Sequence, residues 1–403
     1  MRRIFVAVKY RFLFILVFIS FSFYSQKLAV RVFSAYNLEK VDFSHHNGSY
    51  LIEADSLRFG AVLPNEFVTL KKKSNGKIEL KHGVVLKGVF DTIRLIPTGK
   101  NFSLRIHPKN PQIIERRYQN AFTITTNNTS LVIVNNVDLD NYLAGVVESE
   151  GGGGKHLEYY KAQAVISRTY ALKHKNKHKN EGYHLCDLVH CQAYHNELIY
   201  TPEIRKAVEL TSNKVMVDTI NQRLVDGYFH ANCGGQTSRA DFVWNEDVSY
   251  LQPFKDTFCI HTQQSTWEKR ISKTEWRNYL VNQFHFPIQD SVYKNLVYTF
   301  EQEERKAFYL SPHLGIPLRD IRYHFKLKST FFSCYPQGKD VIIKGKGFGH
   351  GIGLCQEGAM RMASSGLSYK EILKFYFNGI IVKNRFERLY FEQTPDFIYE
   401  KKK

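Results

Sequence analysis

The chain has 403 residues, of which 43% are hydrophobic and 23% charged, a composition that supplies a large core and argues against intrinsic disorder. Lys and Arg total 56 against 38 Asp and Glu, and the formal net charge of +18 predicts attraction to a polyanion. Nucleic acid is disfavoured as that polyanion, because the sequence contains no zinc-finger, homeodomain or RNP-type pattern and the basic residues are spread along the chain. An anionic cell-wall polymer or a membrane surface fits the charge equally well.

Residues 1–25 have the pattern of a secretory signal peptide. Basic residues at positions 2, 3, 9 and 11 precede an apolar stretch at 12–23. This stretch is short for a membrane span, which needs about 20 residues, so we expect cleavage near Ser25 rather than a permanent anchor. The sequence therefore predicts an exported protein of the periplasm or cell envelope, which would touch the membrane only through an uncleaved signal.

A small β-rich region is expected at residues 27–127. Short strand-type runs at 29–33, 78–80 and 83–90 are separated by Asn, Gly and Pro. Nothing in their sequence points to an activity.

A mixed main domain is expected at residues 128–395, with an accessory insertion around 265–322. The hydrophobic patterns predict strands at 131–134 and 143–147, and helices at 158–172, 359–363 and 369–376. The insertion is rich in charged and aromatic residues, with helix-like spacing at Trp267, Ile271, Trp276, Tyr279 and Leu280. The predicted fold class is α+β, with helices packed on β structure in the main domain.

Four sequence blocks, in this order, carry the functional inference: YLAGVVESE at 142–150, KAQAVISRTYAL at 161–172, NCGGQT at 232–237 and GFGHGIGLCQEGA at 347–359. Together they resemble the SpoIID/LytB family over about residues 128–385. The resemblance implies a lytic transglycosylase that cleaves peptidoglycan glycan strands stripped of their stem peptides. LytB-type members are described as amidase enhancers, so a cell-wall amidase is the implied protein partner.

Glu150 is the candidate catalytic residue. It ends the first block and precedes the glycines at 151–154, where a carboxyl at a cleft rim would be partly buried and have a raised pKa. One such carboxyl can first protonate the glycosidic oxygen and then accept a proton from the C6 hydroxyl of muramic acid. The family's usual Met-Pro after this Glu is replaced here by glycines, which predicts a looser loop.

Polar residues within or near the family blocks are the candidate substrate contacts. Lys161 and Arg168 are seven residues apart on one helix face and could bind lactyl carboxylates. His350 lies between glycines, whose backbone can approach a ligand closely. The full predicted set is Lys161, Gln163, Arg168, Tyr170, Tyr194, His230, Thr237, His350 and Gln356.

A ligand set for zinc occurs at residues 184–191, where His184, Cys186, His190 and Cys191 have suitable spacing. A bound ion would be structural, and the predicted reaction requires no cofactor. The competing prediction is a disulfide, because export permits one or two bridges among the six cysteines.

Three other functions compete with transglycosylation. A glycoside hydrolase would pair Glu150 with a second carboxylate such as Glu148, Asp140 or Asp187. A cysteine peptidase would use Cys191 or Cys355 with a histidine such as His350. A non-catalytic enhancer would bind peptidoglycan by charge and assist a separate amidase.

Overall fold

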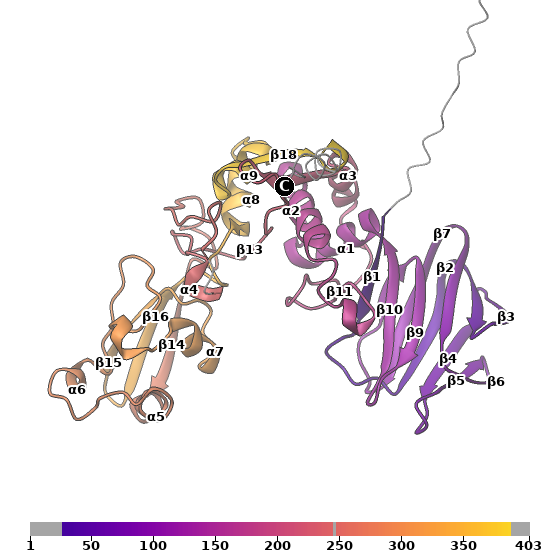
Figure 1. Ribbon diagram of the computed structural model, residues 1–403, viewed down its shortest axis with the longest axis horizontal. Coiled ribbons are helices and arrows are strands. Elements are labelled where there is room, and N and C mark those ends of the chain that lie inside the picture. Colours follow the sequence, from indigo (N-terminus) through magenta and orange to yellow (C-terminus); the bar gives the residue numbers. More distant parts are fainter. Residues whose placement is uncertain (1–25, 245–246, 388–403) are drawn as a thin grey trace, which may run out of the picture.

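The computed structural model describes residues 26–244 and 247–387, and Figure 1 shows them as an arch. One arm is a β-rich region, the centre is a group of helices, and the other arm is a smaller mixed lobe. The predicted signal peptide lies outside the described residues. None of the helices within them is both long and apolar enough to cross a membrane.

The β-rich arm is built on a sheet of eleven strands in the order β11-β1-β10-β9-β7-β2-β4-β5-β6, with β3 paired to β2 and β8 to β7. Alternation of buried and less buried residues, as in Val41 and Phe43 of β2, gives the sheet a packed inner face. The strands are β1 Lys27–Val32, β2 Lys40–Ala54, β3 Leu57–Val62, β4 Phe67–Lys72, β5 Ile78–His82, β6 Val85–Phe90, β7 Ile93–Asn110, β8 Arg116–Gln119, β9 Ala121–Thr126, β10 Leu131–Asp138 and β11 Leu185–Cys186.

The sheet does not end at residue 127. Strand β10, the expected strand at 131–134, pairs with both β9 and β1, and it runs directly into α1 (Leu139–Gly151). The β-rich arm and the helical centre are therefore joined by one continuous segment and share one core.

The helical centre is arranged around α2 (Leu157–Lys173), which is buried on nearly all sides, as expected for an interior helix. Its neighbours are α1, α3 Pro202–Leu210, α8 Gln356–Ser364 and α9 Tyr369–Tyr376. Two small sheets pair β12 Lys214–Asp218 with β18 Ile380–Asn384, and β13 Phe229–His230 with β17 Leu354–Cys355. These pairings bring the fourth family block back to the middle of the molecule.

One secondary-structure prediction at the site is wrong. Residues 143–147 were expected to form a strand but lie within α1. The run of Leu, Ala, Gly and Val is buried all along its length, and such a short apolar run has no period that separates a buried strand from a buried helix. The fold class is confirmed as α+β.

The second arm has its own core and extends beyond the expected insertion at 265–322. Its sheet has the order β14-β16-β15, and Trp276 stacks on Phe325 with ring centroids 5.1 Å apart. Trp267 and Ile271, expected in a helix, lie in β14. The elements are β14 Thr266–Ser272, α5 Lys273–Phe284, α6 Tyr293–Leu296, η2 Pro312–Leu314, α7 Leu318–His324, β15 Phe332–Gln337 and β16 Asp340–Lys346, while η1 Lys179–Glu181 and α4 Asp241–Trp244 belong to the connecting segments.

Candidate active site

Glu150 lies in the last turn of α1, with a partly buried side chain. The backbone N–H of Ala193 donates a hydrogen bond of 2.7 Å to its Oε1. Burial raises the pKa of Glu150, and this single hydrogen bond only partly opposes the shift. The carboxyl is therefore biased toward its protonated form, as a general acid requires.

Two tyrosines and one glutamine surround this carboxyl. The pKa values of Tyr142 and Tyr159 are raised first by burial and further by the nearby charge of Glu150. Nε2 of Gln356 donates to the backbone oxygen of Glu150 at 3.2 Å. Gln356 therefore fixes the end of α1, and this contact places the fourth family block beside the first.

None of the three carboxylates considered as a second catalytic group is available. Glu148 accepts three backbone N–H bonds, from Ile199, Tyr200 and Thr201, at 2.7–2.9 Å. Asp187 is 1% exposed and forms an ion pair of 2.8 Å with Arg116. Asp140 pairs with Arg168 at 3.2 Å. Each has a structural role that would be lost if it acted on substrate.

Arg168 has a structural role instead of the expected substrate contact. It is fully buried, and its guanidinium donates to the backbone oxygens of Val208 and Thr211 at the C-terminal end of α3 and of Lys214 at the start of β12. The resemblance at this position therefore reflects packing of α2 against α3. The cation cannot reach a lactyl carboxylate from inside this core.

Most of the other predicted contacts on and after α2 are also internal. Lys161 donates to Glu158 at 2.6 Å, and Gln163 is buried and donates to Ser167 at 3.4 Å. The hydroxyl of Tyr170 donates to the backbone oxygen of His190, and that of Tyr194 to the side chain of Asn135. The structure shows no face of α2 that presents Lys161 and Arg168 together.

Strand β13 and the loop of the fourth block place His230 and His350 side by side, with ring centroids 5.5 Å apart. His350 also contacts Trp244 (5.2 Å), which contacts Tyr228 (4.4 Å). Trp244 is 41% exposed, so this aromatic cluster reaches the surface. Thr237 is buried and accepts a bond from the backbone of Phe254 instead.

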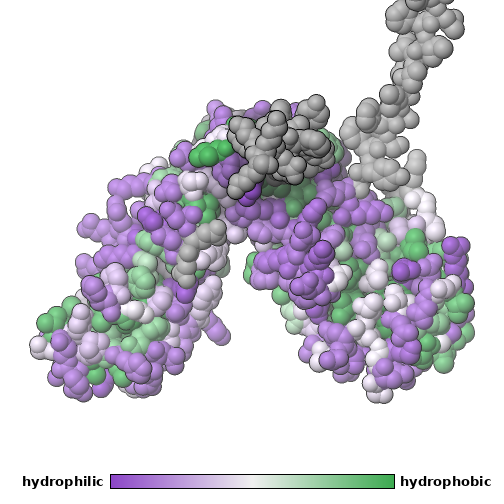
Figure 2. Space-filling view, in the orientation of Figure 1, coloured by the Kyte–Doolittle hydropathy of each residue, from purple (hydrophilic) through white to green (hydrophobic). Residues whose placement is uncertain are grey.

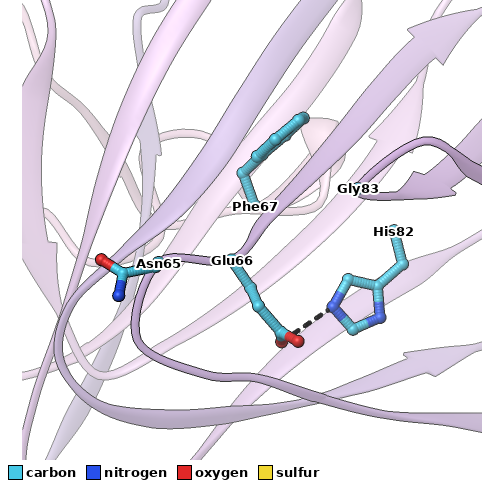
Figure 3. A pocket seen from close by; sticks show the side chains of 5 residues that line it. All are labelled: Asn65, Glu66, Phe67, His82 and Gly83. Carbon is cyan, nitrogen blue, oxygen red and sulfur yellow. Dashed lines mark hydrogen bonds and ion pairs between the residues drawn. The ribbon is translucent and has the colours of Figure 1, made fainter.

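A hollow of about 390 Å³ adjoins the glycine segment that follows Glu150. It is lined by Gly154, Lys155, His156, Thr262, Glu357, Met360, Arg361 and Ser364. Lys155, His156 and Arg361 are exposed and basic. A second hollow, of about 230 Å³, lies in the β-rich arm and is lined by Asn65, Glu66, Phe67, His82 and Gly83 (Figure 3). Its only ionisable side chains are Glu66 and His82, which bind each other.

A candidate metal centre forms just before Ala193, from His178, Cys186, His190 and Cys191. Sγ of Cys191 lies 3.5 Å from Nε2 of His178, and Sγ of Cys186 lies 3.7 Å from Nδ1 of His190. These separations suit the edges of a tetrahedral zinc site. The other ring nitrogen of His178 contacts Glu181 at 2.5 Å, the outer carboxylate that orients metal-binding histidines.

His184 must be removed from the predicted ligand set. Its Nδ1 accepts a hydrogen bond from the backbone of Ala29 at 3.0 Å, which anchors the loop to β1. His178 replaces it, because the turn at 179–183 folds back and brings this earlier histidine to the thiols. His178 lies twelve residues before His190 and outside the segment 184–191 in which the sequence motif placed all four ligands.

The peptidase hypothesis receives no geometric support at Cys355. Its thiol accepts from the backbone N–H of Gly358 and Cys233, and no histidine is among its contacts within the described residues. Cys191 contacts two histidines, but these belong to the four-ligand cluster. Two further site features were absent from the sequence prediction. The Ala193 N–H could not be revealed by any side-chain motif, and Trp244 lies in none of the four blocks.

Comparisons with known proteins agree with the family resemblance, and the matched family model covers the first two of the four blocks. The family model described as SpoIID, Stage II sporulation protein, matches residues 127–217. An uncharacterized protein of Brachyspira hyodysenteriae is 30% identical over 284 residues, which cover 69% of this chain and 75% of the relative. Stage II sporulation protein D of Bacillus amyloliquefaciens is 28% identical, over 62% of this chain and 76% of the relative.

The amidase enhancer of Bacillus subtilis is 27% identical over 59% of this chain but only 39% of its own length. The region matched by the family model includes both helices that carry Glu150 and Arg168. The chain belongs to the SpoIID family of stage II sporulation proteins.

Proposed function

We propose that the chain is an exported cell-envelope enzyme that cleaves peptidoglycan glycan strands as a lytic transglycosylase, with Glu150 as general acid and base. The observation that carries the proposal is the state of this carboxyl: partly buried, with a raised pKa and one hydrogen bond. Relatives named stage II sporulation protein D and amidase enhancer support a role at the cell wall.

The chemistry needs only one carboxyl. Glu150 donates its proton to the glycosidic oxygen as the bond from that oxygen to C1 of muramic acid breaks. The resulting carboxylate takes the proton of the C6 hydroxyl as O6 forms a bond to C1. The product is a 1,6-anhydro ring, no water is consumed, and Glu150 returns to its protonated form.

The alternative of hydrolysis is weaker for a structural reason. Paired-carboxylate hydrolases need a second carboxylate free to activate water or attack C1. Glu148, Asp140 and Asp187 are each held by backbone N–H groups or by an arginine. A single acid that serves both proton transfers fits the described residues better.

Substrate contacts are proposed at two surfaces of the described chain. Trp244 and the rings packed beside it offer an aromatic face on which a sugar ring can stack. Lys155 and Arg361, which line the hollow after the glycine segment, replace Lys161 and Arg168 as the cations available to lactyl carboxylates. Of the substrate contacts predicted from sequence, Gln356 binds the backbone of Glu150, and His350 belongs to the aromatic cluster at Trp244.

A structural zinc ion is proposed at His178, Cys186, His190 and Cys191. All four tetrahedral positions would be filled by protein, which is typical of structural rather than catalytic zinc. The ion would hold the loop whose next residues include Ala193, the hydrogen-bond donor to Glu150. No catalytic step is assigned to it.

The test is the identity of the glycan ends. The full chain and its Glu150→Gln variant are incubated with intact peptidoglycan and with amidase-treated, peptide-free peptidoglycan, and products are analysed by mass spectrometry. We expect 1,6-anhydromuramyl ends from the wild type only, with more on the peptide-free substrate. Glu209→Gln, an exposed glutamate in α3, is the matched control.

Other outcomes distinguish the competing functions. Hydrated reducing ends would identify a hydrolase. Absence of any new glycan end, together with faster release of stem peptides when a cell-wall amidase is added, would identify a non-catalytic enhancer. Equal activity of Glu150→Gln and wild type would remove Glu150 from the mechanism.

A further inference from the structure

A second group of ligand-type side chains lies on the other side of the helical centre and has no part in the proposed reaction. It consists of Cys233, Asp256, Cys259 and Cys355, all fully buried, with ligand atoms within 4.8 Å of one another. Cys233 follows β13, Cys355 ends β17 and caps α8, and the other two lie in one loop. Three segments, distant in sequence, therefore converge on one point.

The separations match a metal site better than a disulfide. Sγ of Cys233 lies 3.3 Å from Sγ of Cys259 and 3.3 Å from Oδ2 of Asp256. Four ligands around zinc, with Zn–S near 2.3 Å, are separated by about 3.8 Å or slightly less where one is oxygen. A disulfide between Cys233 and Cys259 would need the sulfurs at about 2.05 Å, and would leave both Cys355 and Asp256 unexplained.

The carboxylate of Asp256 lacks a cation. Within the described residues its oxygens accept from the Tyr376 hydroxyl (2.9 Å), the Phe258 backbone (2.9 Å) and the Cys233 thiol, but from no Lys, Arg or His. Buried carboxylates in proteins are normally paired with a cation or bound to a metal.

Arg305 supplies an independent observation that points to an anionic centre. Its guanidinium is 8% exposed and donates only to neutral groups in the described part of the chain: the backbone oxygens of Cys233 (2.7 Å) and Gln236 (2.8 Å), and the hydroxyl of Thr330. A buried arginine without an acid is costly. A divalent ion bound by three thiolates and one carboxylate has a net negative charge. The Arg305 guanidinium, bound to the backbone oxygen of the ligand residue Cys233, would partly balance that charge.

The thiol of Cys355 is already provided with donors. The backbone N–H groups of Cys233 and Gly358 point at its sulfur from 3.3 Å and 3.4 Å. Such N–H bonds to sulfur stabilise the thiolate form at metal–sulfur centres. A neutral thiol gains little from two of them.

We propose that Cys233, Asp256, Cys259 and Cys355 bind a second structural metal ion, a thiolate-preferring divalent cation of the zinc type. Three sulfur ligands and one oxygen fill a closed tetrahedral site, so the ion has no open position for catalysis. Its role is to tie β13, the loop at 256–259 and the start of α8 together. Because Arg305 belongs to the second arm, the same site also anchors that arm to the helical centre.

The experiment measures metal, not activity, so it is independent of the proposed transglycosylase function. The full chain is purified without chelator, supplied with Zn²⁺, passed through a desalting column and analysed by inductively coupled plasma mass spectrometry. Cys355→Ser is expected to lose one equivalent of zinc relative to wild type, and Cys186→Ser to lose a different one, so that the double variant retains neither. Cys334→Ser, at a buried cysteine outside both groups, is expected to retain all of it.

A second measurement needs no variant. Crystals of the wild-type chain should show an anomalous peak at the zinc absorption edge enclosed by the four side chains. Unchanged zinc content in a folded Cys355→Ser variant, or a wild-type crystal without this peak, would overturn the proposal. A cross-linked peptide joining Cys233 to Cys259 in a non-reduced digest would overturn it in favour of a disulfide.

Discussion

The two thiol-containing groups differ most in how far their members are separated along the chain. His178, Cys186, His190 and Cys191 lie within one loop, whereas Cys233 and Cys355 are 122 positions apart. A cross-link within one loop restricts little of the unfolded chain, while one that joins distant segments restricts much more. The first group should therefore act locally, on Glu150 through Ala193, and the second should act on the stability of the whole helical centre.

Figure 2 places this contrast in the shape of the molecule. The two arms have mainly hydrophilic surfaces and are separated by an open hollow below the helical centre. The group at 178–191 lies toward the β-rich arm, because its residue Cys186 is in β11 and β11 pairs with β1. The group of Cys233 and Cys355 lies toward the smaller arm, because Arg305 of that arm binds the backbone of Cys233. One group therefore supports each side of the site.

The largest expected effect is on stability. Cys355→Ser should remove the long-range metal and lower the thermal midpoint by on the order of ten degrees, because structural zinc contributes folding free energy directly. Differential scanning calorimetry with and without added Zn²⁺ measures this. The comparison fails if Cys186→Ser lowers the midpoint more than Cys355→Ser does.

The next largest effect is on catalysis. Glu150→Gln should lower the rate of anhydro-end formation by roughly 10²- to 10⁴-fold, the usual contribution of general acid–base catalysis. Its thermal midpoint should change little, since the carboxyl has one hydrogen bond to lose. A variant with low activity that was also unfolded would not count, so circular dichroism accompanies the assay.

Cys191→Ser sharpens the distinction between the two groups. Loss of one ligand should loosen the loop that carries Ala193 and lower activity by about 10- to 100-fold, as is typical when a group that supports a site is removed. The midpoint should fall less than in Cys355→Ser. Full activity in a zinc-free Cys191→Ser protein would show that the metal-binding loop does not support Glu150.

Gln356→Ala tests how the fourth family block supports Glu150, and its expected effect on rate is smaller than that of Cys191→Ser. Removing its 3.2 Å bond to the backbone of Glu150 should cost about 0.5–1.5 kcal/mol, or up to roughly tenfold in rate. Gln302→Ala, at a buried amide in the second arm that also donates to backbone oxygens, is the matched control for a lost amide bond. Equal rate losses in both variants would mean that the Gln356 bond has no special role.

The smallest effect is a shift in pH dependence. Because burial raises the pKa of Glu150, the wild-type rate should fall on the alkaline side as pH rises through that pKa and the acid is lost. The Ala193 N–H bond lowers this pKa, so Cys191→Ser should move the alkaline limb upward by a fraction of a pH unit. A downward move would show that the bond stabilises the acid instead.

The helices of the centre were predictable from sequence. Helices α8 and α9 have clear amphipathic periodicity, whereas α2 is buried on nearly all sides and was identified as a helix within a family block. The strand expected at 143–147 was lost to α1, since an entirely buried apolar run has no diagnostic period. The boundaries at 127 and 322 could not be placed, because β10 pairs with β1 and β14 pairs with β16, and in each pair the two strands lie far apart along the chain. The second arm therefore extends to β16.

The site was predictable where chemistry and sequence proximity coincide. Glu150 and the thiols at 186 and 191 stand out in a linear reading, whereas Arg168 matched a family block for reasons of packing. Lys155, Trp244 and Asp256 are unremarkable until the fold places them. Motifs report that a residue type is needed at a position, but not whether it faces substrate or core.

The position of Glu150 in the final turn of α1 has an electrostatic consequence. Aligned peptide dipoles give the C-terminal end of a helix a partial negative charge of about half an elementary charge. No basic residue occupies the last turn to neutralise it. The helix axis thus ends on a carboxyl whose ionisation it opposes, so the backbone of α1 favours the protonated form of Glu150 that the proposed reaction requires.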